Sequence, residues 1–88
     1  MARPLVAGNW KMNTTVQEAA ALASTVRDAL DDVSSVDVVL CPPYVFLIEV
    51  ASALSDTHIH AGSQNMHFED KGAFTGEVSP TMLQGLCG

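Results

Sequence analysis

The sequence predicts an α/β fold built from parallel βαβ units. Three short apolar runs, at residues 4–9, 36–41 and 58–63, have the length of buried strands. The segments that follow them carry apolar residues at helical spacing, so strands and helices alternate along the chain. The chain has 88 residues, of which 48% are hydrophobic and 16% charged, and this suits ordinary globular material of no more than one domain.

The first unit joins a strand to an amphipathic helix. Pro4 bounds the apolar stretch that suits a strand over residues 4–9. Thr14 or Thr15 is the candidate N-cap of a helix, and Glu18 lies three residues after Thr15, the spacing of a capping box. Its apolar residues share one helical face: Val16, Ala19, Ala20, Ala23, Val26 and Leu30.

The second unit repeats this order. The valine-rich run 36–41 is expected to end at Pro42-Pro43, because proline restricts the residue before it and cannot donate to a strand ladder. A helix is expected over residues 47–54, where apolar side chains recur at i, i+3, i+4 and i+7.

The third unit contains a long connection. A weaker strand over residues 58–63 is followed by fourteen residues, Gln64 to Glu77, without a helical or strand pattern. Connections of that length in a compact domain are usually functional or disordered. Ser79-Pro80 then predicts the start of a third helix, with Ser79 as N-cap and Pro80 at the first helical position.

One face of this sheet is predicted to lack a cover. Parallel sheets are buried on both faces, and three helices can cover only one of them. The other face must be closed by more strands, by another chain or by the interior of a barrel. The apolar ending at residues 82–88 fits the same expectation, that the sequence is a piece of a longer chain.

Charge and composition exclude several function classes. Four basic against ten acidic residues give a net charge of −6, which argues against a nucleic-acid or acidic-membrane partner. No apolar run approaches the roughly 20 residues of a membrane span, and the N-terminal apolar stretch is too short for a signal peptide. Two cysteines, Cys41 and Cys87, predict reduced thiols and a cytoplasmic location.

The sharpest candidate site lies at the carboxyl end of the first strand, at Gly8-Asn9-Trp10-Lys11. Loops at the carboxyl ends of parallel strands build the active sites of α/β folds. In extended backbone Asn9 and Lys11 would point the same way and Trp10 the other. A cation and an amide aimed together suit an anionic or carbonyl-bearing ligand. The alternative is a solvated lysine beside a packing tryptophan.

The histidines and Cys41 are weaker candidates for a functional site. His58, His60 and His67 include a zinc-compatible H-x-H pair but no third ligand at a convincing spacing, so a metal site is disfavoured. Cys41 ends the second strand without a basic neighbour in sequence, which favours an inert thiol over a nucleophile.

The connection from Gln64 to Glu77 leaves two interpretations open. Phe68 and Phe74 need something to pack against, and interfaces are enriched in aromatic residues. An Ω-loop folded on its own side chains explains the composition equally well. Its glycines do not form a phosphate loop, because the GK[ST] ending is absent.

Four motifs, in order, carry a resemblance to a known family. They are Ala7-Gly8-Asn9-Trp10-Lys11-Met12-Asn13, Cys41-Pro42-Pro43, Gln64-Asn65 and the segment from Glu69 to Pro80, EDKGAFTGEVSP. Together they resemble the triosephosphate isomerases. The resemblance implies a TIM (β/α)₈ barrel of typically ~250 residues, of which this chain would hold strands 1–3 and helices 1–3. Residues 1–88 would then be the N-terminal part of a single TIM-barrel domain.

The resemblance also implies an activity. Triosephosphate isomerases interconvert dihydroxyacetone phosphate and glyceraldehyde 3-phosphate by proton transfer, without cofactor or metal. Lys11 matches the lysine that offsets substrate and enediolate charge, and Asn9 matches the asparagine beside it. The general base and the electrophile lie outside these residues, so the chain alone is expected to be inactive. The alternative is a non-catalytic (βα)₃ fragment that acts as an association or complementation module.

A homodimer is implied as well. The resemblance places Phe74, Thr75, Gly76 and Glu77 at the tip of a loop that docks into a partner subunit. Thr75 resembles the residue that reaches the partner's asparagine and lysine region. This implication favours the interface interpretation of the loop over the Ω-loop.

Overall fold

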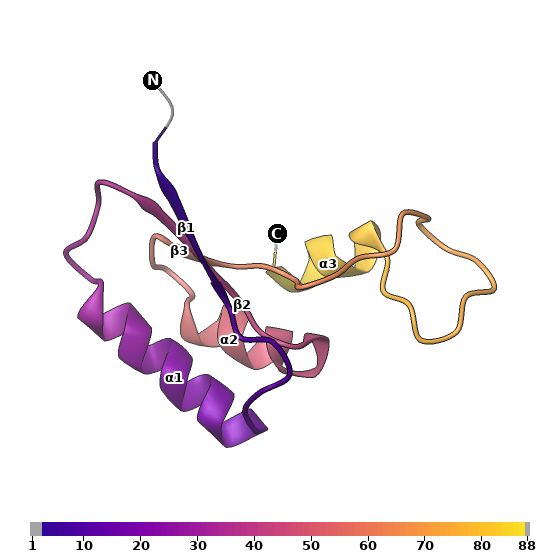
Figure 1. The fold of residues 1–88 in the computed structure, drawn as a ribbon, viewed down its shortest axis with the longest axis horizontal. Coiled ribbons are helices and arrows are strands. Elements are labelled where there is room, and N and C mark those ends of the chain that lie inside the picture. Colours follow the sequence, from indigo (N-terminus) through magenta and orange to yellow (C-terminus); the bar gives the residue numbers. More distant parts are fainter. Residues whose placement is uncertain (1–2, 88) are drawn as a thin grey trace.

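The computed structural model describes residues 3–87 and confirms the alternation of strands and helices (Figure 1). Along the chain the elements are β1 (Leu5–Asn9), α1 (Val16–Ala29), β2 (Asp37–Cys41), the 3₁₀ turn η1 (Tyr44–Phe46), α2 (Leu47–Ala53), β3 (Ile59–Ala61) and α3 (Pro80–Cys87). The strands form one open parallel sheet in the order β1-β2-β3. This arrangement matches a (βα)₃ part of the expected barrel. Gly88, the last residue of the predicted apolar ending, lies outside the described residues.

The strand register brings the carboxyl ends of the strands to one edge. Asn9 pairs with Cys41 across β1 and β2, and Leu40 pairs with Ala61 across β2 and β3. All three strands run in the same direction, so the loops that leave them emerge side by side. Residues that are distant in sequence are therefore neighbours at this edge.

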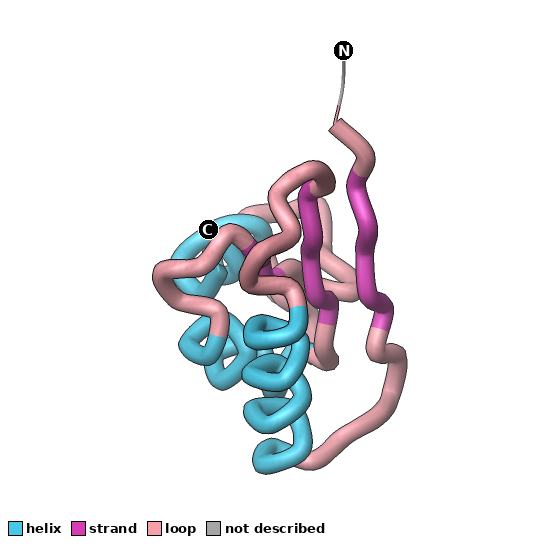
Figure 2. Tube along the Cα trace, turned by 90° about the vertical axis from the view of Figure 1, so that its left-hand side faces the viewer, coloured by secondary structure: helices cyan, strands magenta, loops and turns pink. Residues whose placement is uncertain are grey.

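The core lies on one face of the sheet. Side chains alternate along a strand, and Val38, Leu40 and Ile59 share the face that packs against α1 and α2. The helices contribute Ala19, Ala23 and Val50 to this buried cluster, and Leu54, the C-cap of α2, completes it. Figure 2 shows the helices gathered on that side of the strands.

The opposite face is open, as the sequence predicts. Val39 and Cys41 point to it and are only half-buried, and Ala7 of β1 is exposed. The apolar side chain of Leu5 is 66% exposed. Within residues 3–87, β1 has a strand partner on one side only, so its other edge presents unpaired backbone groups.

Local capping fixes where two helices begin. The hydroxyl oxygen of Thr15 accepts a hydrogen bond from the Glu18 backbone N–H at 3.3 Å, and the Glu18 carboxylate accepts one from the Thr15 N–H at 2.9 Å. The predicted capping box is thus confirmed. The Ser79 hydroxyl accepts from the Met82 N–H at 3.3 Å, and α3 begins at Pro80 as expected. No helix within residues 3–87 has the length and apolarity to cross a membrane.

The second and third units differ in detail from the prediction. A 3₁₀ turn precedes α2, because Pro43 has a fixed φ of −54° and its carbonyl accepts from the Phe46 N–H at 3.0 Å. The third strand is shorter than residues 58–63 and spans Ile59–Ala61. The Gly62 N–H still donates to the Leu40 carbonyl at 2.9 Å, so contact with β2 continues one residue beyond the strand.

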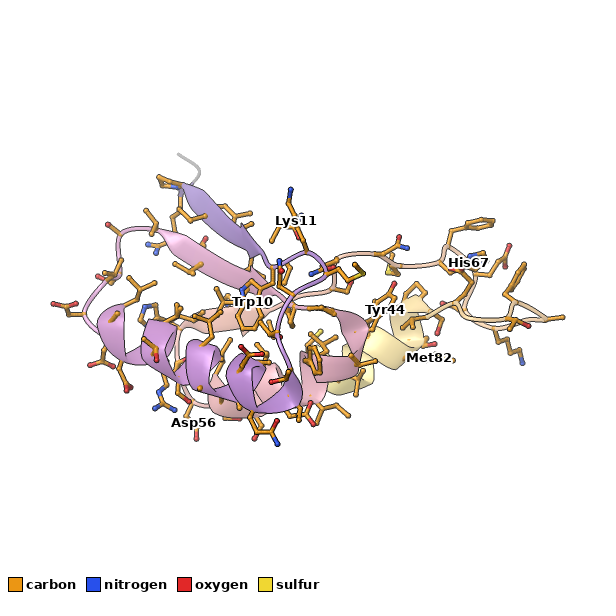
Figure 3. All side chains as sticks on the ribbon, turned by 60° about the horizontal axis from the view of Figure 1, so that its bottom comes forward. Trp10, Lys11, Tyr44, Asp56, His67 and Met82 are labelled. Carbon is orange, nitrogen blue, oxygen red and sulfur yellow. The ribbon has the colours of Figure 1, made fainter. Side chains whose placement is uncertain are left out.

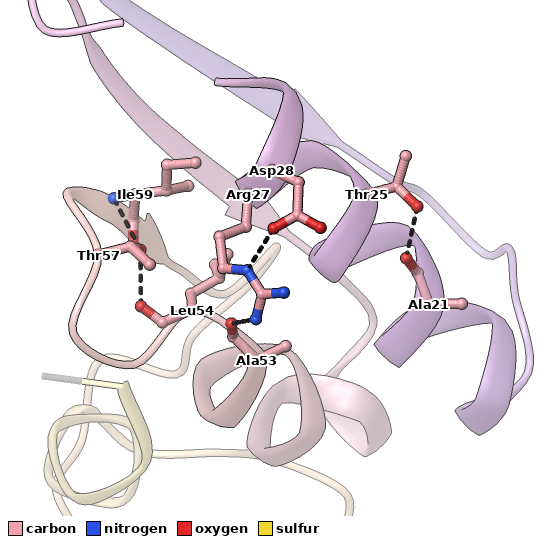
Figure 4. A network of polar contacts seen from close by, with 8 residues as sticks. All are labelled: Ala21, Thr25, Arg27, Asp28, Ala53, Leu54, Thr57 and Ile59. Carbon is pink, nitrogen blue, oxygen red and sulfur yellow. Dashed lines mark hydrogen bonds and ion pairs between the residues drawn. The ribbon is translucent and has the colours of Figure 1, made fainter. Parts of the chain in front are cut away.

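Side-chain hydrogen bonds connect α1, α2 and β3 (Figure 4). Arg27 near the end of α1 donates to the Ala53 carbonyl at 3.1 Å, which satisfies a carbonyl at the end of α2. The Thr57 hydroxyl donates to the Leu54 carbonyl at 2.7 Å and accepts from the Ile59 N–H at 3.2 Å. The turn between α2 and β3 is thereby held on both sides.

We expect Thr15→Ala to lower the free energy of unfolding by about 1 kcal/mol, because it removes the N-cap acceptor of α1. Thr25→Ala is the matched control in the same helix, where the hydroxyl donates to the Ala21 carbonyl at 2.9 Å and the residue is exposed. Alanine is the better helix former, so this variant should be neutral or slightly stabilised. Chemical denaturation measures both, and equal losses would contradict a capping effect.

Candidate active site

The candidate site lies where the carboxyl ends of the three strands meet. The Trp10 N–H donates to the Cys41 carbonyl at 3.1 Å, which ties the end of β1 to the end of β2. Gln64, three residues after β3, also bonds to this carbonyl. Residues from three separate segments therefore share one small region at the sheet edge.

The backbone leaves the extended conformation immediately after β1. Lys11 has a φ of 57°, in the left-handed region that non-glycine residues rarely adopt. The side-chain oxygen of Asn9 accepts a hydrogen bond from the Lys11 N–H at 3.0 Å, a local turn that competes with the strand. The expectation of extended backbone from Asn9 to Lys11 is therefore wrong, because this hydrogen bond folds the chain back.

The Lys11 ammonium group forms no ion pair with any carboxylate of residues 3–87. Figure 3 shows the Lys11 side chain turned away from the sheet, while Trp10 points toward the helices. Trp10 packs against the core cluster and anchors the loop. The ion pairs within residues 3–87 involve Arg3, Arg27 and His67, not Lys11. The site thus offers a positive charge on Lys11 and, in Asn9, an amide whose oxygen is engaged by the Lys11 N–H and whose Nδ2 is a hydrogen-bond donor.

Gln64 is a member of the site that residue spacing did not single out. Its side-chain nitrogen donates to the Lys11 carbonyl at 2.9 Å and to the Cys41 carbonyl at 2.8 Å. Two signals in the sequence pointed to it: the position of Gln64 at the end of the third apolar run, and its place in the Gln64-Asn65 motif that carries the family resemblance. The partners of its side chain depend on the register of the sheet and could not be read from spacing.

Cys41 does not have the environment of a nucleophile. Burial, and secondly the neighbouring Cys87, raise the pKa of the Cys41 thiol above its ordinary value. A raised pKa lowers the fraction of thiolate at neutral pH, and the thiolate is the reactive form. This supports the interpretation of Cys41 as an inert thiol.

The three histidines belong to two separate segments of the fold. His58 and His60 flank and occupy the short strand β3, whereas His67 belongs to the long connection. Within residues 3–87 no three side chains of His, Cys, Asp or Glu gather in a way that could hold a metal ion.

The connection from Gln64 to Glu77 forms a projecting loop that packs partly on itself. Its two ends are joined by a hydrogen bond from the His67 N–H to the Val78 carbonyl at 2.8 Å. The His67 ring lies 4.6 Å from the Phe68 ring and 4.3 Å from the Phe74 ring, measured between centroids. The His67 Nδ1 atom is 3.7 Å from a Glu77 carboxylate oxygen. This internal packing is the feature that the Ω-loop interpretation expects.

The tip of the same loop is open to solvent. Phe74 is 49% exposed, and Thr75, Gly76 and Glu77 are exposed as well. Gly72 allows the Phe74 ring to lie against the loop backbone, because a Cβ at position 72 would lie 2.6 Å from that ring. The loop projects away from the sheet in Figure 1, so the structure does not bring these residues to the Lys11 of the same chain.

The comparisons with known proteins agree with this geometry. Residues 4–87 match the family model described as triosephosphate isomerase. The chain is 55% identical over 86 residues to the triosephosphate isomerase of Carboxydothermus hydrogenoformans, covering 98% of this chain and 34% of that protein. It is 46% identical over 87 residues to that of Dehalococcoides mccartyi, covering 99% and 35%. The chain thus spans about a third of the length of these relatives, and it belongs to the triosephosphate isomerase family.

Proposed function

We propose that residues 1–88 form the N-terminal part of a TIM-barrel isomerase that interconverts dihydroxyacetone phosphate and glyceraldehyde 3-phosphate. The observation that carries this proposal is the un-neutralised Lys11 ammonium group, held beside Asn9 at the carboxyl ends of the strands. The reaction serves glycolysis and gluconeogenesis, and a cytoplasmic location fits it. The two relatives named above carry the name of this enzyme.

The chemistry proposed for the site is electrostatic. Moving a proton between neighbouring carbons of a phosphorylated triose builds negative charge on the substrate oxygens. The Lys11 ammonium group would offset that charge, and the Asn9 amide nitrogen would donate a hydrogen bond beside it. Because the backbone of Lys11 is fixed before substrate arrives, little reorganisation is required during reaction. Neither group is suited to abstract a carbon-bound proton, and the family resemblance places the base and the electrophile beyond these 88 residues.

A homodimer is the proposed assembly. The exposed tip from Phe74 to Glu77 extends away from its own barrel segment, as a docking element must.

An association module is the second candidate. The open sheet face and the bare edge of β1 favour it, because exposed apolar strands are prone to pair with another chain. In this case the 88 residues would dock on a complementary barrel fragment without catalysing a reaction themselves.

We expect the isolated 88-residue chain to show no isomerase turnover, because the family resemblance places the general base and the electrophile beyond it. Positioned acid–base groups contribute on the order of 10²–10⁴-fold each to the rate. A chimera in which residues 1–88 replace the matching segment of the Carboxydothermus hydrogenoformans enzyme should be active. A coupled assay, with protein purified from a host lacking its own isomerase, measures both. An inactive but folded chimera would favour the association module, and activity of the isolated chain would refute the predicted absence of a base.

Lys11→Met in the chimera should lower kcat/KM by roughly 10²–10³-fold, the scale of losing one preorganised electrostatic group. The substitution keeps the length of the side chain and removes its charge. Gln17→Met, at an exposed position of α1, is the control for introducing methionine. Both variants should melt within a few degrees of the parent. A loss below tenfold, or a fall in Tm that explains the loss, would identify Lys11 as a solvated loop residue.

Replacing Phe74 by Asp and Thr75 by Arg should weaken the dimer of the chimera, because charge placed in a desolvated interface costs several kcal/mol. Sedimentation velocity measures the dissociation. Activity should fall with it and recover partly at higher protein concentration, as mass action requires. An unchanged dimer with a lower Tm would show that the loop packs on its own barrel, in agreement with the Ω-loop.

A further inference from the structure

The unusual backbone of Lys11 needs a structural cause. A non-glycine residue at a φ of 57° is strained, and such strain persists only where the surroundings over-determine it. Both backbone polar groups of Lys11 are engaged by side chains. Its N–H donates to the Asn9 oxygen at 3.0 Å, and its carbonyl accepts from the Gln64 nitrogen at 2.9 Å.

We propose that Gln64 is a positioning residue that holds the backbone of Lys11, and hence aims its ammonium group, by a double hydrogen bond to the Lys11 and Cys41 carbonyls. The proposal rests on the function proposed above for Lys11. It adds a residue that lies 53 positions away in sequence and that does not itself touch the substrate.

The orientation of the Gln64 amide follows from its partners. Both are carbonyl oxygens, which only accept, so the NH₂ end and not the oxygen must face them. An amide nitrogen has two N–H bonds, and each is used once. One side chain therefore links the loop after β1 to the end of β2.

Gln64 differs from the other side chains that shape this loop. Asn9 bonds two residues ahead, and Asn13 donates to the Trp10 carbonyl at 2.7 Å, three residues back. Such local side-chain hydrogen bonds fix the form of the turn, and the backbone bond from the Trp10 N–H to the Cys41 carbonyl ties its start to the sheet. The bonds of Gln64 reach from beyond β3 and include Cys41 of the central strand, so they fix the turn relative to the sheet.

The test uses a double-mutant cycle in the chimera. Gln64→Met keeps a similar side-chain length and removes both N–H groups. It should lower kcat/KM by about 10- to 100-fold, the scale of misplacing a reacting group by about an ångström. In the Lys11→Met background the same substitution should have almost no further effect, because Gln64 acts through Lys11. Gln64→Glu places an acceptor oxygen where the amide nitrogen of Gln64 donates to both carbonyls, so its kcat/KM should fall at least as far as that of Gln64→Met. Gln17→Met should leave kcat/KM unchanged.

Two results would overturn the proposal. Equal losses from Gln64→Met with and without Lys11 would assign Gln64 a general structural role. A crystal structure of the Gln64→Met chimera in which Lys11 keeps its left-handed φ and its place at the strand ends would refute positioning whatever the activity. The failure of the proposed function would give a different result: the parent chimera would be inactive, or Lys11→Met would leave its activity unchanged. In either case the crystal structure of the Gln64→Met chimera still tests whether Gln64 positions Lys11.

Discussion

The carbonyl oxygen of Cys41 is the point on which the candidate site depends. It accepts hydrogen bonds from the Trp10 N–H at 3.1 Å and from the Gln64 side chain at 2.8 Å, so both of its lone pairs are used. These bonds join the segments after β1 and β3 to the end of β2. They form only when β1 and β2 pair with Asn9 opposite Cys41. A shift of one residue would turn Lys11 and its supporting groups to the other face.

Much of the fold follows from local signals. The helix α1 was predictable because Thr15 and Glu18 satisfy each other across four residues, and α3 because Ser79-Pro80 is a strong start signal. The parallel sheet follows from the alternation of apolar runs with helical patterns. The 3₁₀ turn η1 was missed, because Pro43 can begin either a 3₁₀ turn or an α-helix and the choice depends on packing.

The candidate site was predictable in its residues but not in its geometry. Asn9 and Lys11 could be selected from their place at the carboxyl end of the first strand, and the family resemblance named the same two. The left-handed turn at Lys11 and the role of Gln64 could not be predicted, because they arise from contacts across 53 residues. Strained backbone and long-range hydrogen bonds of side-chain amides leave no periodic pattern in a sequence. Both are concentrated at sites where function overrides local conformational preference.

The two interpretations of the long loop are compatible once its packing is considered. His67 stacks on Phe68, packs at a tilt against Phe74 and lies close to Glu77, so the loop has internal side-chain contacts of its own. Phe68 nevertheless remains 80% exposed. A loop already ordered by internal contacts loses less conformational entropy when its tip docks on a partner, and such preorganisation strengthens binding. The internal packing that defines an Ω-loop therefore serves an interface, because it holds the exposed tip in the shape that a second subunit would meet.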